Sequence, residues 1–403
     1  MSTKVTQAAE KTLYSVLVAI AAAHFLNDWI QALVPSMYPI FKDEYHLTFS
    51  QIGWLTFVFQ CTASLLQPLI GFYTDKYPKP FSQVIGMFFS LSGIVMLAYT
   101  HSYGGLLVAV SLIGMGSAVF HPESARVSFI AAGKRRGLAQ SIFQIGGNLG
   151  TAFGPLTIAW FVVGHGQRQV LVFIWVALAG MALLTRIAFW YRHHIVRNTI
   201  QQRSVQFEHH LSKKQVKGAV FLLLVIIFSK FFYTASISSY YTFYLMDQFS
   251  LTIQQAQFHL FLYLAAYAVG TMLGGPLGDR FGRKWVIGFS VFGAAPFTLL
   301  LPYVNLWWTD ALMIAIGLII SSAFPAILVY AQELMPKKLG MVSGLFYGLA
   351  FGMAAMGSAI MGHLADMYSI EMVYRMAAFF PLIGGVFYFL PNLKAAKKEV
   401  TAA

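Results

Sequence analysis

Four ionisable side chains lie inside long apolar stretches of the sequence. Asp28, Glu123, Arg126 and Lys230 each sit in a run of the length that crosses a membrane. An ionised group at the centre of a bilayer costs roughly 2.5–3.5 kcal/mol on insertion scales, so such residues usually face an internal cavity and have a function. The chemistry open to them is the binding of protons and of a charged ligand.

The two acids are candidates for handling protons. Asp28 follows His24 by four residues, which places both side chains on one face of a helix. A hydrogen bond there can orient the imidazole and change the affinity of either group for a proton. Glu123 and Arg126 can pair locally, since three residues separate them. We expect Asp28 and Glu123 to carry protons, Arg126 to pair with a deprotonated carboxylate and His24 to act as a relay. The alternative is a purely structural network of buried charges.

Lys230 is the candidate for binding an anion. It lies in a stretch rich in aromatic and hydroxyl side chains, and a desolvated ammonium group among such donors can grip an anionic group. The alternative is that Lys230 only neutralises Asp28. Both lie near the middle of an apolar run, and each of these runs is the first of one half of the chain. The candidate substrate-binding residues are Lys230, Asn27, His121, Gln144, Tyr233, Tyr240, Tyr241 and Tyr267.

The composition requires a membrane protein with many spans. Of the 403 residues, 10% are charged and 58% are hydrophobic, and the mean hydropathy is +0.66. A soluble protein carries roughly a quarter charged residues, and a membrane helix takes about 20 apolar residues. The composition excludes a large soluble catalytic domain and a disordered chain. The single cysteine, Cys61, excludes a disulfide scaffold.

Apolar runs separated by charges or turn residues predict an all-α membrane protein with twelve transmembrane helices. The runs are too long for the strands of a β-barrel. The predicted spans are 12–41, 49–73, 82–100, 105–131, 138–163, 169–191, 218–246, 253–277, 285–304, 309–335, 340–366 and 372–391.

The net charge of +13 is spread over short gaps between spans, which argues for membrane topology and against a nucleic-acid partner. Basic residues gather in alternate gaps, whereas the opposite gaps hold Lys42, Arg168 and Arg375. By the positive-inside rule, we expect both termini in the cytoplasm. The first apolar run is too long for the core of a signal peptide, so we expect no cleaved peptide.

Two halves of the sequence echo each other at a near-constant distance along the chain. Two six-helix halves are the plan of a transporter that rocks one repeat against the other. We expect an N-terminal half at 1–191, a basic cytoplasmic linker at 192–217 and a C-terminal half at 218–403. The histidine pairs in the linker are expected to be solvated, and no metal site is expected. The matched pieces are Leu47-Thr48 with Leu251-Thr252 and Gly71-x-x-x-Asp75-Lys76 with Gly275-x-x-x-Asp279-Arg280.

The second of these repeats resembles a known family. The segment GPLGDRFGRK, residues 275–284, resembles the loop motif of the major facilitator superfamily. Its copy at 71–80 is degraded, since Pro78 replaces the second glycine. The segments 24–28, 120–126 and 229–245 resemble members of the superfamily that export drugs from bacteria. The resemblance covers essentially the whole chain and implies a major facilitator fold in the bacterial inner membrane.

The resemblance implies a proton-coupled antiporter that exports small anionic or amphiphilic drugs, phosphonate antibiotics among them, by alternating access. We expect a monomer driven by the proton gradient without a cofactor, whose partners are the small-molecule substrate, protons and the lipid bilayer. Gly150-x-x-x-Gly154-Pro155 resembles the antiporter motif of span five, but Ile158 and Ala159 replace its closing glycine pair. That departure leaves open a proton-coupled symporter that imports a phosphorylated or carboxylated metabolite.

An enzyme is disfavoured, because the spans contain no nucleotide-binding loop, no His-Glu-x-x-His helix and no serine nucleophile elbow.

The loop motif also predicts a conformational latch formed by Asp75, Asp279, Arg280 and Arg283. Both aspartates follow a span at the expected N-terminus of a helix from the other half. The helix dipole favours a carboxylate there by roughly 0.3–1 kcal/mol, which is enough to bias one conformation and still release. Solvated loop aspartates are the alternative.

Glycines recur every four residues in spans five, eight and eleven. They allow helices to approach closely, either as static packing or as surfaces on which the halves slide.

Overall fold

The computed structural model describes residues 12–132, 136–195, 211–335 and 339–393, and every regular element in these ranges is a helix. The first half contains α2 (Tyr14–Ser36), α3 (Tyr38–Glu44), α4 (Phe49–Ser64), α5 (Gln67–Lys76), α6 (Ser82–Tyr99), α7 (Tyr103–Ala131), α8 (Arg136–Phe161), η1 (Gln167–Phe173) and α9 (Ile174–Ile195). The second half contains α10 (Lys213–Phe249), α11 (Ile253–Phe281), α12 (Arg283–Val291), η2 (Phe292–Ala294), α13 (Ala295–Leu300), η3 (Leu301–Tyr303), α14 (Leu306–Ser321), α15 (Ala323–Leu334), α16 (Leu339–Met367), α17 (Ile370–Ala377), α18 (Phe380–Ile383) and η5 (Gly384–Phe389).

Each predicted span corresponds to one helix or to consecutive helices. In the described residues, 11 segments are long and apolar enough to cross a membrane. The remaining span, α8, is 26 residues long but carries Gln144, Asn148 and several glycines, which lower its hydropathy. The predicted all-helical membrane fold is confirmed. Both ends of the interval 192–217 are helical, since α9 runs to Ile195 and α10 begins at Lys213, and residues 196–210 lie outside the described part.

Several spans expected to be continuous are bent or divided. The first bends at Met37, where α2 with its internal Pro35 gives way to α3. The second divides at Leu65, just before Pro68 in the first turn of α5. Proline removes a backbone donor and clashes with the preceding turn, so it ends or kinks a helix.

The sequence repeat corresponds to a repeated turn. In each half, one described residue other than glycine adopts a left-handed backbone conformation, with φ of 51° and 53°. Two residues later, a threonine caps the next helix through a capping box with a glutamine. The caps satisfy backbone donors at the start of α4 and α11. The matching residues are His46, Thr48 and Gln51 in the first half and Ser250, Thr252 and Gln255 in the second.

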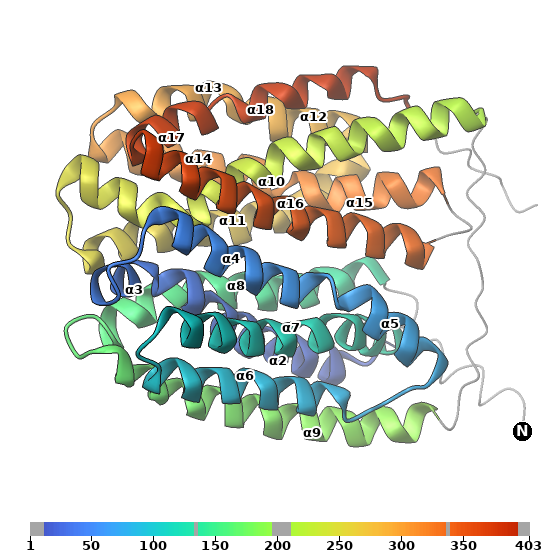
Figure 1. The fold of residues 1–403 in the computed structure, drawn as a ribbon. Helices are drawn as coiled ribbons and strands as arrows, with labels where there is room; N and C mark the ends of the chain where they lie inside the picture. Colours follow the sequence, from blue (N-terminus) through green and yellow to red (C-terminus); the bar gives the residue numbers. More distant parts are fainter. Residues whose placement is uncertain (1–11, 133–135, 196–210, 336–338, 394–403) are drawn as a thin grey trace, which may run out of the picture.

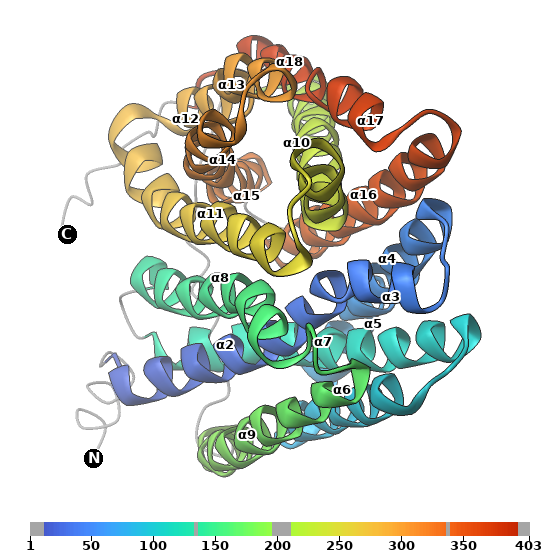
Figure 2. The same cartoon turned by 90° about the vertical axis from the view of Figure 1, so that its left-hand side faces the viewer.

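The helices form two bundles that lie side by side, as Figure 2 shows, with α2–α9 in one and α10–η5 in the other. Across the boundary, α4 packs against α16 and α8 packs against α11. We name the two ends of the molecule from Figure 1. The α3 end carries α3 and the turn between α10 and α11. The linker end carries the C-terminus of α9 and the N-terminus of α10.

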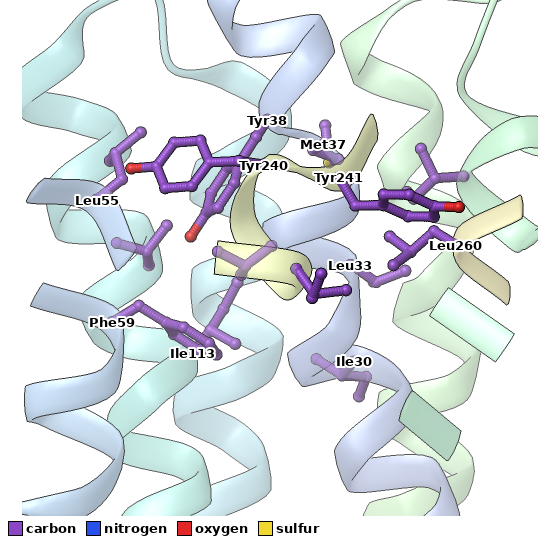
Figure 3. Packing of buried hydrophobic residues seen from close by; sticks show 14 of the residues in the cluster. Ile30, Leu33, Met37, Tyr38, Leu55, Phe59, Ile113, Tyr240, Tyr241 and Leu260 are labelled. Carbon is purple, nitrogen blue, oxygen red and sulfur yellow. The ribbon is translucent and has the colours of Figure 1, made fainter. Parts of the chain in front are cut away.

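The apolar core is shared between the bundles at the α3 end and divided at the linker end. One cluster of buried residues joins both halves, and Figure 3 shows Leu33 and Tyr38 of the first half beside Tyr240 and Leu260 of the second. Towards the linker end, one cluster lies in the second half alone. Another, around Leu17, lies in the first half alone. The described residues therefore hold the halves together mainly at the α3 end.

The glycine row of α8 packs inside the first half. A Cβ added at Gly146, Gly150 or Gly154 would meet α2, at Ala21, Phe25 or Ala32 respectively. The row of α11 similarly faces α14 and the start of α15 within the second half. Static packing therefore explains these two rows, and the alternative that they are sliding surfaces between the halves is wrong.

We expect Gly150→Ala to lower the free energy of unfolding by about 1–3 kcal/mol, the usual cost of overpacking. The new methyl group would meet the carbonyl oxygen of Phe25 on α2. Thermal unfolding of the purified protein in detergent measures the effect. Gly348→Ala is the matched control, because among the described residues no atom outside its own helix backbone and chain neighbours lies within 4 Å of its added Cβ. Equal melting temperatures for the two variants would contradict close α2–α8 packing.

Candidate functional site

Asp28 lies between two histidines from different helices. Its Oδ2 is 3.1 Å from Nε2 of His24, one turn earlier on α2, as the spacing predicted. Its Oδ1 is 3.8 Å from Nε2 of His121 on α7. The His121 and Asp28 side chains retain 24% and 19% of their exposure, so a proton can reach the cluster from solvent.

The other ring nitrogens determine how the cluster can hold protons. His24 Nδ1 lies 2.8 Å from the carbonyl oxygen of Phe143, and His121 Nδ1 lies 3.0 Å from that of Ser117. A carbonyl oxygen only accepts, so Nδ1 of His24 must carry a hydrogen, whereas Nδ1 of His121 also lies 3.1 Å from the Ser117 hydroxyl, which can donate or accept. In a neutral His24 imidazole, Nε2 then offers a lone pair. That lone pair would face Asp28 Oδ2 and be repelled unless a proton lies between them. The geometry therefore favours retention of a proton.

The surroundings of this cluster come from α2 and α8. Asn27 donates from Nδ2 to Asp28 Oδ1 at 2.9 Å, and Phe143 stacks on the His24 ring with centroids 4.0 Å apart. A Cβ at Gly147 would overlap His24 and Asp28, so α8 needs glycine here. The structure thus places Asn27 and His121, both predicted as substrate ligands, in the polar cluster of Asp28.

Glu123 and Arg126 form the expected pair on α7. Arg126 Nη1 donates to Glu123 Oε1 at 3.0 Å and to the backbone oxygen of Thr74 at 2.7 Å. Thr74 lies on α5, directly before Asp75 of the loop motif. Glu123 is 1% exposed. The pair therefore neutralises a buried acid and ties α7 to the helix that carries the first loop motif.

Lys230 is fully buried in the middle of α10, with 0% exposure. Its Nζ lies 5.1 Å from the ring centre of Phe231, 5.6 Å from that of Tyr267 and 5.5 Å from that of Phe324. Within the described ranges, no hydrogen-bond acceptor contacts Nζ. Asp28 pairs with histidines instead, so the structure gives no support to a Lys230–Asp28 ion pair.

The remaining predicted ligands fall into different environments. Tyr233 and Tyr241 are buried in the second half, and their hydroxyls have no hydrogen-bond partner among the residues described. The hydroxyl of Tyr240 donates to the backbone oxygen of Ser358 at 2.7 Å and is thereby occupied. Gln144 follows Phe143 on α8 and is half-buried.

The predicted latch is only partly described. The side chains of Asp75 and Asp279 lie outside the described part of the structure. Arg280 is exposed and lies 5.4 Å from the ring centre of Phe281. Arg283 forms an ion pair with Glu333 of α15, which is a contact within the second half.

A contact that the sequence did not reveal joins the halves at the α3 end. Asp366, near the end of α16, accepts hydrogen bonds from the backbone amides of Phe49 and Ser50, both at 2.7 Å. These amides open α4, so the carboxylate lies at the positive end of that helix. Gln257 of α11 adds a bond of 2.6 Å to the backbone oxygen of Ser36. We call the Asp366 contact the α3-end latch.

Two bundles of membrane-length helices around buried ionisable groups define a membrane transporter, and comparison with known proteins gives its class. The family model of the Major Facilitator Superfamily matches residues 20–250 and 222–403, and the chain belongs to this superfamily. The resemblance predicted from the loop motif is confirmed. The chain is a multi-pass inner-membrane transporter and not an enzyme. It lies in the lipid bilayer and binds a small-molecule substrate. Members of its superfamily generally need no cofactor.

Individual relatives cover nearly the whole chain. It is 52% identical over 382 residues to the fosmidomycin resistance protein of Escherichia coli (strain K12). This alignment covers 95% of this chain and 94% of the relative. It is 40% identical over 393 residues to the uncharacterized MFS-type transporter YfnC of Bacillus subtilis (strain 168), covering 96% of each. A solved bacterial homologue of the human lysosomal transporter Spinster, inward-facing and unoccupied, has the same fold. Its TM-score is 0.72 at 16% identity, over 94% of this chain and 96% of that one.

We expect Asp366→Asn to weaken closure at the α3 end by about 1–2 kcal/mol, since charge-assisted hydrogen bonds exceed neutral ones by that order. Spin labels at Glu44 and Tyr368, exposed in opposite halves, would report a larger population of long distances. The matched control is Asp247→Asn, which removes an exposed acid from the same end. Identical distance distributions for both variants would show that Asp366 does not hold the halves together.

Proposed function

We propose that this transporter is a proton-coupled antiporter that exports small anionic or amphiphilic drugs, including fosmidomycin-like phosphonates, by alternating access. The observation that carries the proposal is the arrangement of His24, Asp28 and His121. Their geometry favours one retained proton, and a buried cation, Lys230, lies in the other half. The identity to the fosmidomycin resistance protein supports the choice of substrate class.

In the proposed cycle, Asp28 is the main proton carrier. Loss of its proton leaves a carboxylate oxygen facing the lone pair of His24 Nε2, 3.1 Å away. The cluster therefore has to be reprotonated or to rearrange. Because His24 and Asp28 both lie on α2, such a rearrangement would couple the protonation of the cluster to the position of this helix. Glu123 is the second proposed carrier, with Arg126 as its counter-charge. Arg126 also donates to the backbone oxygen of Thr74. A change in the charge of Glu123 would therefore alter the position of Arg126 and, through Thr74, the helix that carries the loop motif.

Lys230 is the proposed grip for the anionic group of the substrate. Three aromatic rings surround Nζ within 5.6 Å, and rings of this kind stabilise a cation without neutralising it. An incoming phosphonate or carboxylate would supply the missing opposite charge. Tyr233, Tyr241 and Tyr267 are the proposed neighbouring donors, and Gln144 is proposed to reach the substrate from the first half. The bare ammonium group thus favours anionic over neutral drugs.

We propose that the halves 1–191 and 218–403 rock about this site, with both termini and the linker 192–217 in the cytoplasm. The positive-inside rule then makes the linker end cytoplasmic. The shared core and the α3-end latch close the opposite, periplasmic end. This arrangement supports access from the cytoplasm, the side from which an exporter loads its substrate. In the opposite state, Asp75, Asp279, Arg280 and Arg283 are proposed to latch the linker end, and the transporter works as a monomer.

A proton-coupled symporter for a phosphorylated or carboxylated metabolite is the second candidate. Ile158 and Ala159 in place of the glycine pair of the antiporter motif keep this candidate in view. In an antiporter, substrate and proton compete, whereas in a symporter they bind together.

Proton release on substrate binding tests the proposal directly. Adding fosmidomycin to purified protein in weak buffer should release protons from the wild type and much less from Asp28→Asn, because the amide cannot hold the exchanged proton. A pH indicator measures the release at several pH values. Binding is checked independently by calorimetry. Binding without release, or with proton uptake, would exclude exchange and favour the symporter or an uncoupled carrier.

We expect Lys230→Gln to weaken binding of anionic drugs at least tenfold and to leave neutral amphiphilic drugs within about twofold, because a desolvated charge pair contributes about 1.5–3 kcal/mol. Equilibrium binding in detergent measures both classes. Lys217→Gln is the matched control, since it removes an exposed lysine of the same helix near the linker end. Equal losses for anionic and neutral drugs would show that Lys230 serves the structure rather than charge recognition.

A further inference from the structure

The second half contains a half-buried histidine–aspartate pair of its own. His259 on α11 and Asp310 on α14 approach to 2.6 Å between Nδ1 and Oδ1, with side chains 14% and 20% exposed. Both lie in the second turn of a membrane-length helix at the α3 end. Ionisable residues within a transmembrane segment are costly and are functional candidates by default. Neither residue has a part in the cycle proposed above.

A group of tyrosines lies between this pair and Lys230. Asp310 acts electrostatically on Tyr241 of α10, and the Tyr241 ring lies 6.4 Å from that of Tyr374 on α17. Towards the middle of the bundle, the rings of Tyr263 and Tyr267 are 6.0 Å apart. Tyr267 in turn is one of the rings around Lys230. Tyrosine side chains thus occupy the region between the two ionisable sites.

Most hydroxyls of this group make no hydrogen bond within the described ranges. Tyr374 donates to the backbone oxygen of Ser236 at 3.3 Å. The hydroxyls of Tyr233, Tyr241, Tyr244 and Tyr263 are buried and have no partner within the described ranges. Buried polar groups are almost always hydrogen-bonded, so a cluster of exceptions calls for a role. A phenol both donates and accepts, which is the property that a proton relay needs.

The titratable groups near the pair come from α10 and α17. Tyr241 faces Asp310 from α10, and Tyr244 on the same helix is influenced by Glu371 and Arg375 of α17. Glu371 and Arg375 pair with each other at 2.6 Å, so they neutralise each other. Among the groups facing it, Asp310 has His259 as its nearest basic partner. Asp310 therefore faces His259 without another basic partner in competition among the described residues.

We propose that His259 and Asp310 form a second proton-binding site in the second half, separated from Lys230 by the tyrosine group. One cycle would then carry one proton more than Asp28 and Glu123 account for. In the neutral state, Nδ1–H of His259 donates to Asp310 Oδ1. Protonation adds a hydrogen at Nε2, and the resulting imidazolium is paired with the carboxylate; release returns that proton to the solution without any other bond being made or broken. The proposal rests on the proton coupling proposed above and adds a site in the half that was otherwise assigned to the substrate.

The ratio of protons to substrate tests the proposal. The full-length protein is reconstituted into vesicles, and the membrane potential that stops net fosmidomycin transport is measured at a fixed pH gradient. We expect the ratio to fall by one proton in Asp310→Asn and in His259→Gln, both of which keep the approximate side-chain shape. Asp247→Asn, an exposed acid at the same end, is the matched control and should keep the wild-type ratio.

The outcomes separate this proposal from the preceding one. A wild-type ratio of zero would overturn both proposals, since no proton would then be coupled. A ratio that responds to Asp28→Asn but stays at the wild-type value in Asp310→Asn and His259→Gln would overturn the second site alone. If Asp310→Asn does not fold, His259→Gln decides.

Discussion

The close approach of α2 and α8 is the constraint on which the proton site depends. A row of glycines lets the backbone of α8 meet that of α2, which brings the Phe143 carbonyl within 2.8 Å of His24 Nδ1. That contact fixes the imidazole and directs its Nε2 at Asp28. Any side chain at Gly147 would displace both groups. The packing of two helices within one half therefore determines the chemistry of the carboxylate.

The halves share a scaffold but differ in the charges that they enclose. The same left-handed residue and threonine cap begin α4 and α11, so the repeat preserves the entry angle of these helices. In the first half, the membrane-embedded acids have imidazole and guanidinium partners, one turn away on the same helix for each acid and on α7 as well for Asp28. In the second half, the mid-membrane charge is a lysine whose surroundings are aromatic rings. This difference would let one scaffold bind two ligands of opposite charge, one in each half.

Local features of the sequence predicted much of the fold and part of the site. The spans follow from apolar run length, and the His24–Asp28 contact follows from helical spacing alone. The approach of His121 does not, because it depends on how α7 lies against α2. Asp366 and the His259–Asp310 pair were missed for two reasons. Each lies near the end of a span, where a charge looks like part of a loop, and each has its partner on a distant segment. The glycine rows indicated close packing but not the helix that they face.

The two sides of the α3-end latch contribute different kinds of groups. On one side the contact is made by the Asp366 side chain, and on the other by main-chain amides of Phe49 and Ser50. Main-chain donors are present whatever side chain occupies these positions, apart from proline, which lacks the amide hydrogen. Substitutions at the start of α4 can therefore accumulate without loss of the contact. The strength of this one contact is therefore adjustable by mutation of α16 alone.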